Sequence, residues 1–321
     1  MSRLILRALP LATLVAFLPV SNALAHCIVG ARFFPAMLAT DDPCVADEMS
    51  LPTVQYNSAN PAGREHDVEA DFSKRITENF GITVAATWTR VSPSADPTSG
   101  SPVGYGFQNV VTTAQFQLLK DAPRELALLA GVIFNWGNSG AAGVGAVSWG
   151  TITPTGYFGK GFGDLPDSAG FLRAFAVTGQ VGYEIPTTSF DPVAGNPIPQ
   201  NVVWGTSLQF SMPYLKSNVV DLRLPDFFNH LMPIVEAQFV RPVANNFGID
   251  NITTGTVNPG VIWVGSYFQV GLEAIVPINR ASGTSIGAVA QLHLYLDDIF
   301  PNSLGQPLLG ASTPMQSMAR R

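Results

Sequence analysis

Polar and apolar residues alternate with a period of two along most of the chain. In residues 65–74, four acidic side chains occupy alternate positions, and mostly apolar residues lie between them. Successive side chains of a β-strand point to opposite faces, so this strand has one wet face and one apolar face. The same alternation returns in residues 82–89, 110–118, 124–136, 147–159, 171–184, 201–212, 230–241, 261–276 and 286–298. The pattern predicts a wall of strands between water and lipid.

The connections between these segments alternate between short and long. Residues 77–81 form a tight link, whereas residues 92–105 form a long loop rich in Ser, Pro and Gly. Residues 216–229 break this trend, and we expect a helical turn there. Adding a strand at 51–57 and a short return strand in 303–312 gives an even number. We therefore expect an all-β fold, an antiparallel transmembrane β-barrel of about 12 strands, with 10 as the alternative.

The composition supports a membrane setting without transmembrane helices. Only 12% of the 321 residues are charged, 46% are hydrophobic, and the mean hydropathy is +0.23. After residue 25 the longest uninterrupted apolar run is residues 126–134, well short of the roughly 20 residues that a spanning helix needs. A closed barrel is the remaining way to satisfy every backbone group in lipid. A pI of about 5.1 argues against nucleic-acid binding.

The start of the chain resembles an export signal. Residues 1–25 combine two arginines, a short apolar run and an Ala23-Leu24-Ala25 cleavage site. Export and a barrel pattern together predict the outer membrane of a Gram-negative bacterium, with lipid and lipopolysaccharide as neighbours. The expected divisions are a signal peptide at 1–25, an N-terminal periplasmic segment with a possible first strand at 26–57, the outer-membrane barrel at 58–300, and a short closing strand and loose tail at 301–321.

Cys27 and Cys44 are the only two cysteines. In an oxidising periplasm we expect a disulfide between them. The alternative is a lipoprotein, because Leu24-Ala25-His26-Cys27 resembles a lipoprotein box. Cleavage after Ala25 would also place the His26 imidazole beside a free amine, a pair that suits Cu(II). We favour an accident of the cleavage position, because the chain has only four histidines and no motif for a second ligand, so we predict no metal site and no cofactor.

The alternation points an acidic set of side chains into the lumen. The predicted lumen-lining residues are Glu69, Asp71, Gln115, Gln117, Glu184, Gln209, Glu236, Gln238, Gln269 and Glu273. One interpretation is a pore that favours cations or neutral polar solutes, since rings of carboxylates select by their field. The other is a narrow, plugged lumen in which carboxylates and amides hydrogen-bond across the barrel and hold it shut.

Three stretches resemble a known family of bacterial outer-membrane barrels. Residues 73–81, 106–109 and 157–166 are similar to the MetA-pathway-of-phenol-degradation family, and the likeness extends over roughly residues 64–300. The resemblance implies a barrel fold and a transport function. These are turn and girdle motifs, so no functional residue carries over and the solute is not implied.

The leading hypothesis is a passive channel or transporter for small solutes, of unknown oligomeric state. The alternatives are a non-conducting structural or loop-presenting barrel and a barrel-embedded hydrolase. The sequence contains no H-x-x-x-H motif and no Cys/His spacing of a metal site. We therefore predict that the protein is not an enzyme.

Overall fold

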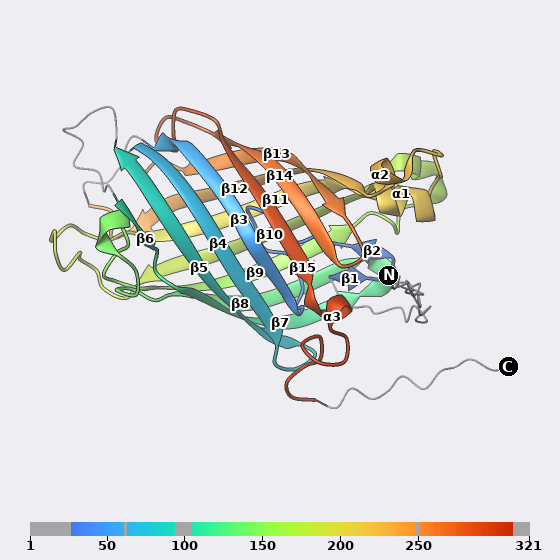
Figure 1. The fold of residues 1–321 in the computed structure, drawn as a ribbon, viewed down its shortest axis with the longest axis horizontal. Coiled ribbons are helices and arrows are strands. Elements are labelled where there is room, and N and C mark those ends of the chain that lie inside the picture. Colours follow the sequence, from blue (N-terminus) through green and yellow to red (C-terminus); the bar gives the residue numbers. More distant parts are fainter. Residues whose placement is uncertain (1–26, 61–62, 94–103, 248–250, 311–321) are drawn as a thin grey trace, which may run out of the picture.

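The fold is a closed antiparallel β-barrel of twelve strands, as the sequence predicted (Figure 1). The computed structural model describes residues 27–60, 63–93, 104–247 and 251–310. The predicted signal peptide lies outside these ranges. The strands are β3 (Glu48–Asn60), β4 (Gly63–Arg75), β5 (Phe80–Pro93), β7 (Val111–Asp121), β8 (Leu126–Asn135), β9 (Thr151–Gly161), β10 (Phe175–Pro186), β11 (Gln200–Phe210), β12 (Leu231–Ala244), β13 (Thr254–Val264), β14 (Phe268–Pro277) and β15 (Gly287–Tyr295). A short strand, β6 (Gly104–Phe107), pairs with β5 and extends β7.

The count of twelve is right, but two of the predicted strands are wrong. Residues 261–276 are not one strand: they hold the end of β13, a turn at 265–267 and most of β14. The described part of the predicted closing strand, residues 303–310, forms turns and bends. The barrel closes instead by direct pairing of β15 with β3, which contains the predicted strand at 51–57. The period-two pattern runs on through the short turn, and this concealed the break.

The two faces of the wall differ as the alternation predicts. On β7, Gln117 faces inward and is 6% exposed, whereas its neighbours Phe116 and Leu118 face outward and are 48% and 60% exposed. A similar inward–outward alternation marks β9, where Thr153, Thr155 and Tyr157 are buried. The outward residues form the apolar surface that we expect to contact lipid.

One end of the barrel carries most of the helical structure. Figure 1 shows β1 (Ile28–Val29), β2 (Arg32–Phe33), α1 (Met212–Asn218), α2 (Asp226–Asn229) and α3 (Leu296–Ile299) gathered there. We call it the short-turn end, because the tight β4–β5, β7–β8 and β13–β14 turns lie at this end. The connection between β11 and β12 is long here and contains α1 and α2, as its composition indicated. Among the described residues, no helix is long and apolar enough to cross a membrane.

The 3-10 helices mark further connections. They are η1 (Ala122–Arg124), η2 (Ala142–Val144) and η3 (Asp167–Ala174). The first and last belong to the short-turn end, where the side chain of Asp121 caps η1 by accepting a hydrogen bond from the backbone N–H of Arg124. The helix η2 lies at the opposite end, which we call the loop end.

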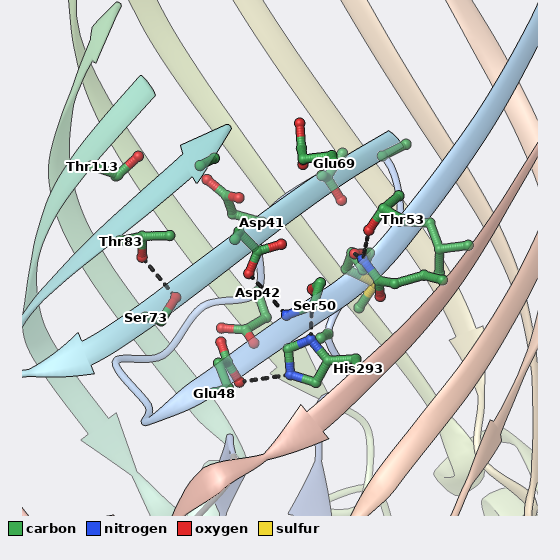
Figure 2. A pocket seen from close by; sticks show the side chains of 18 of the residues that line it. Asp41, Asp42, Glu48, Ser50, Thr53, Glu69, Ser73, Thr83, Thr113 and His293 are labelled. Carbon is green, nitrogen blue, oxygen red and sulfur yellow. Dashed lines mark hydrogen bonds and ion pairs between the residues drawn. The ribbon is translucent and has the colours of Figure 1, made fainter. Parts of the chain in front are cut away.

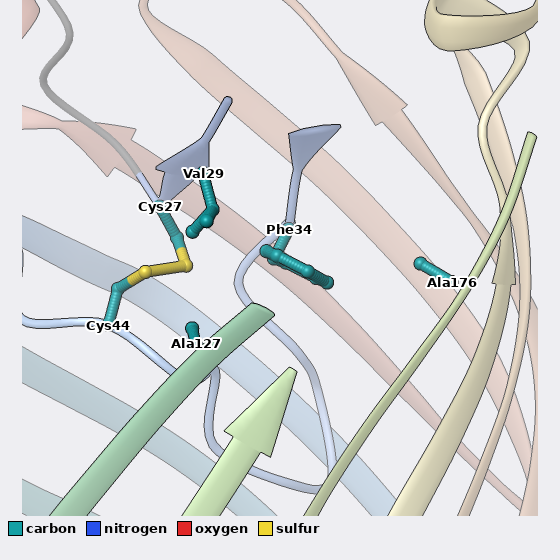
Figure 3. Packing of buried hydrophobic residues seen from close by; sticks show 6 residues of the cluster. All are labelled: Cys27, Val29, Phe34, Cys44, Ala127 and Ala176. Atoms are coloured by element: carbon teal, nitrogen blue, oxygen red, sulfur yellow. A yellow bond between two sulfur atoms is a disulfide. The ribbon is translucent and has the colours of Figure 1, made fainter. Parts of the chain in front are cut away.

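The N-terminal segment lies inside the barrel, although we expected it outside in the periplasm. The β1–β2 hairpin covers the short-turn end, and the chain then enters the lumen and returns to begin β3. We call residues 27–47 the plug. A disulfide joins Cys27 to Cys44 across its base, with 5.3 Å between their Cα atoms. Phe34 of the plug packs there with Val29 and with two wall residues, Ala127 and Ala176 (Figure 3).

Candidate functional site

The plug is fastened at mid-lumen by one glutamate of the wall. Glu236 on β12 is fully buried, and its carboxylate accepts three backbone N–H hydrogen bonds, from Leu38 at 2.8 Å, Ala39 at 3.2 Å and Thr40 at 2.8 Å. The Thr40 hydroxyl donates a fourth at 2.8 Å. A charged acceptor strengthens each of these bonds. This one side chain therefore provides hydrogen-bond acceptors for the backbone N–H groups in the turn of the plug, which would otherwise be buried without partners.

Amide side chains of the wall also bind the plug. Gln269 on β14 donates from Nε2 to the carbonyl of Ala36 at 2.6 Å. On the opposite side of the plug, the backbone N–H of Asp41 donates to Oε1 of Gln180 at 3.0 Å. The plug is thus held from β10, β12 and β14.

Ion pairs hold the base of the plug. Asp47 is fully buried and accepts hydrogen bonds from Lys74 Nζ at 2.7 Å and Arg75 Nε at 2.8 Å. Arg32 is equally buried, pairs with Glu125 at 3.0 Å and lies over the ring of Tyr214. Burial lowers the pKa of the Arg32 guanidinium, and the Glu125 carboxylate acts in the opposite direction. Removing either partner would leave a buried charge unpaired.

Cavities remain between the plug and the wall, and two of them bear on function. The larger of these two, of about 320 Å³, is lined by the plug and by residues of β3, β4, β5, β7, β8, β10 and β15 (Figure 2). We call it the acidic cavity, because five carboxylates line it: Asp41, Asp42, Glu48, Glu69 and Asp71. The second, of about 290 Å³, lies beside Leu38 and Ala39 and shares Glu69 with the first. The lumen is therefore narrowed rather than filled.

The two aspartates on the plug, Asp41 and Asp42, both have a raised pKa. Asp41 is accessible from the cavity, yet protein encloses it on most sides, and the loss of bulk water raises its pKa to about 6. The charges of Asp71, Glu69 and Glu236 act in the same direction, and the nearby Tyr157 hydroxyl opposes them. Burial also raises the pKa of Asp42 well above its usual range.

The structure places all ten predicted lumen residues on the inward face, but in different surroundings. Glu69, Asp71 and Gln115 line the acidic cavity, and Gln238 lines the second cavity. Glu236, Gln269 and Gln117 contact the plug. Glu184 accepts a hydrogen bond from Asn201, and Gln209 donates to Ser207. Glu273 is buried near Glu236 and has no hydrogen-bond partner among the described residues.

A serine, a histidine and a glutamate also meet at the β3–β15 seam. The Ser50 hydroxyl lies 2.9 Å from Nδ1 of His293, whose Nε2 lies 3.1 Å from the Glu48 carboxylate (Figure 2). This is the order of a nucleophile, a base and an orienting acid. However, Asp42 and Asp71 border the same cavity, and their charges would oppose the oxyanion that acyl transfer forms. We interpret the hydrogen-bonded row of Ser50, His293 and Glu48 as a structural link across the β3–β15 seam that closes the barrel.

The contacts of the plug have no counterpart in any pattern of the sequence. Glu236 was predicted to line the lumen, but its partners Leu38, Ala39 and Thr40 lie almost 200 positions away along the chain. Ser50 and His293 are 243 positions apart. The cysteine pair was the single available signal of order in this region.

Comparison with known proteins supports the fold. No known family model and no curated protein matches the chain. Among solved structures, the COG4313 outer membrane channel from Pseudomonas putida F1 has a TM-score of 0.52 at 11% identity, over 82% of this chain and 99% of that channel. The NanC porin has 0.47 at 6% identity, over 76% and 98%, and LpxR from Salmonella typhimurium has 0.41 at 10%, over 77% and 99%. At such identities the likeness shows an outer-membrane type of barrel and nothing finer.

Proposed function

We propose that the protein is a passive outer-membrane channel for small hydrophilic solutes, and that cations pass more readily than anions. The observation that carries this proposal is the surface of the two cavities beside the plug. Carboxylates from β3, β4 and the plug line them, whereas the basic side chains Lys74 and Arg32 are held in ion pairs at the base. Fixed negative charge in a narrow passage attracts cations and repels anions more strongly than it does in bulk water.

The plug sets the width of the proposed path. Solutes enter at the loop end, pass the second cavity beside Ala39, and reach the acidic cavity along the β3–β5 wall. Glu69 is one of four residues that line both cavities, with Leu38, Ala39 and Thr53, so the two cavities adjoin there. Below it, the base of the plug and its disulfide narrow the short-turn end, so passage there requires movement of the plug or of the turns around it.

A second candidate is a barrel that stays closed and serves a structural or surface-binding role. The four hydrogen bonds on Glu236 and the buried ion pairs of Asp47 and Arg32 favour it, because they hold the plug firmly. The resemblance to the MetA-pathway family and export by a signal peptide agree with the channel proposal, and both remain predictions.

Ion selectivity in planar bilayers tests the proposal. We expect the purified protein to pass current. In a KCl gradient its reversal potential should be displaced from zero toward the K⁺ equilibrium potential. The double variant E69Q/D71N should shift that potential toward the Cl⁻ side, most at low ionic strength, where screening is weak. The control E184Q removes one inward carboxylate outside both cavities and should change the potential little. A protein that passes no current, or whose selectivity is unchanged in E69Q/D71N, would refute the channel or its acidic path.

A further inference from the structure

The acidic cavity has a one-sided balance of charge. Five of its lining residues are carboxylates, and among the described residues that line it none is Lys or Arg. Its one basic side chain, His293, is engaged by Ser50 and Glu48. Carboxylates gathered around about 320 Å³ repel one another, and a positively charged occupant would relieve this repulsion.

The cavity also retains capacity to accept hydrogen bonds. An ionised carboxylate has about four acceptor positions. The structure gives Glu69 one donor, the Thr87 hydroxyl at 2.7 Å, and gives Asp71 the backbone N–H of Ser50 at 3.2 Å. An independent sign comes from Gln291, which is 7% exposed and lines the cavity. Its amide oxygen is buried and accepts no hydrogen bond within the described part of the chain. These acceptors call for a ligand rich in N–H donors.

The rest of the lining narrows the chemistry. Hydroxyls of Ser73, Thr83 and Thr113 face the same space (Figure 2), and no Phe, Tyr or Trp is present among the described lining residues. Quaternary ammonium groups are usually held by aromatic faces, whereas a primary ammonium offers three N–H donors to oxygen acceptors. A volume of about 320 Å³ lies at the lower end of the roughly 300–1,000 Å³ of small-molecule sites, so the cavity suits a small ligand.

We propose that the acidic cavity is a binding site for a small organic cation that bears a primary ammonium group. Asp41 of the plug and Glu69 and Asp71 of β4 supply the charge, and Gln291 supplies a further acceptor. The bound amine bridges the plug and the wall, so the site is complete only while the plug is in place. The proposal rests on the channel function only in that the lumen must admit the solute.

Calorimetric titration of the purified, folded barrel in detergent tests the site. The probes are n-butylamine, tetramethylammonium as a cation without N–H donors, and butyrate as an anion. We expect n-butylamine to bind at least about tenfold more tightly than tetramethylammonium, the ratio that one charge-assisted hydrogen bond provides. Butyrate should not bind. The variants E69Q/D71N and D41N should each weaken amine binding by about tenfold or more, and E184Q should bind as the wild type does.

The outcomes separate this proposal from the channel proposal. Equal affinity for both cations would show only nonspecific attraction to negative charge and would overturn the proposed amine site. Absence of amine binding, or unchanged binding in both E69Q/D71N and D41N, would also overturn it. If either variant fails to fold, the comparison of probes on the wild type still decides. If the barrel conducts K⁺ but binds no amine, only the proposed amine site is refuted. If it binds amine but does not conduct, only the proposed channel function is refuted.

Discussion

Replacing Glu236 with Gln should release the turn of the plug. The carboxylate accepts four hydrogen bonds, one on Oε1 and three on Oε2. Glutamine keeps one acceptor oxygen and places an NH₂ donor where the other oxygen was, so between one and three plug donors lose their acceptor. A hydrogen bond to a charged group contributes about 1.5–3 kcal/mol, and water in the lumen replaces part of that. We expect the seating of the plug to weaken by about 2–4 kcal/mol, which is a factor of roughly 30 to 1000 in the ratio of displaced to seated plug.

Two measurements report this displacement. In planar bilayers, E236Q should give a larger and noisier single-channel current than the wild type, because the plug stays tied at its base by the disulfide and by Asp47. In detergent, limited chymotrypsin digestion should cleave the variant near Met37 and Leu38 and leave the wild type intact there. The matched control is E184Q, whose carboxylate contacts Asn201 and not the plug. If E236Q matches E184Q in both current and cleavage, Glu236 does not hold the plug.

Four further outcomes are expected. Phe116→Arg should destabilise the barrel in lipid vesicles by about 2–4 kcal/mol in urea unfolding, and the inward Gln115→Arg much less; equal costs would reject the orientation of β7. Because the pKa of Asp41 is raised to about 6, its charge is present above that pH and lost below it, so K⁺ preference should fall between pH 7 and 5, and a flat profile would contradict this assignment. A fluorophosphonate probe should leave Ser50 unlabelled, whereas labelling would favour the hydrolase. Intact mass of the exported protein should show cleavage after Ala25 with the two cysteines joined, and a mass increase from diacylglycerol would indicate a lipoprotein instead.

The wall of the barrel could be predicted from the sequence because its physics is local. Each strand must alternate between lumen and lipid, so Gln115 and Gln117 were separated from Phe116 by position alone. The strand count came out right through two opposite errors: one predicted strand divides into β13 and β14, and the predicted closing strand is absent from residues 303–310. The turn at 265–267 is only three residues long, so it barely interrupts the period-two alternation and the pattern does not reveal it.

The plug could not be predicted because nothing in its sequence repeats. Residues 27–47 are neither alternating nor helical in pattern, and the partners that fix them lie on distant strands. Thr40 and Glu236 are 196 positions apart, and Arg32 and Glu125 are 93 apart. The alternation placed Glu236 in the lumen, but whether an inward carboxylate faces water or a buried backbone turn depends on a tertiary contact.

The position of the plug also constrains the order in which the molecule can fold. The plug directly precedes β3, and β3 is one side of the seam that β15 closes, with Ser50 and His293 joined across 243 positions. Pairing over such a separation is slow, because the chain must first close a very long loop. The disulfide, by contrast, joins cysteines only 17 positions apart. The small bridged loop can therefore form while the wall is still an open sheet, and the last seam then closes around a loop already folded, so the barrel is assembled with its contents inside.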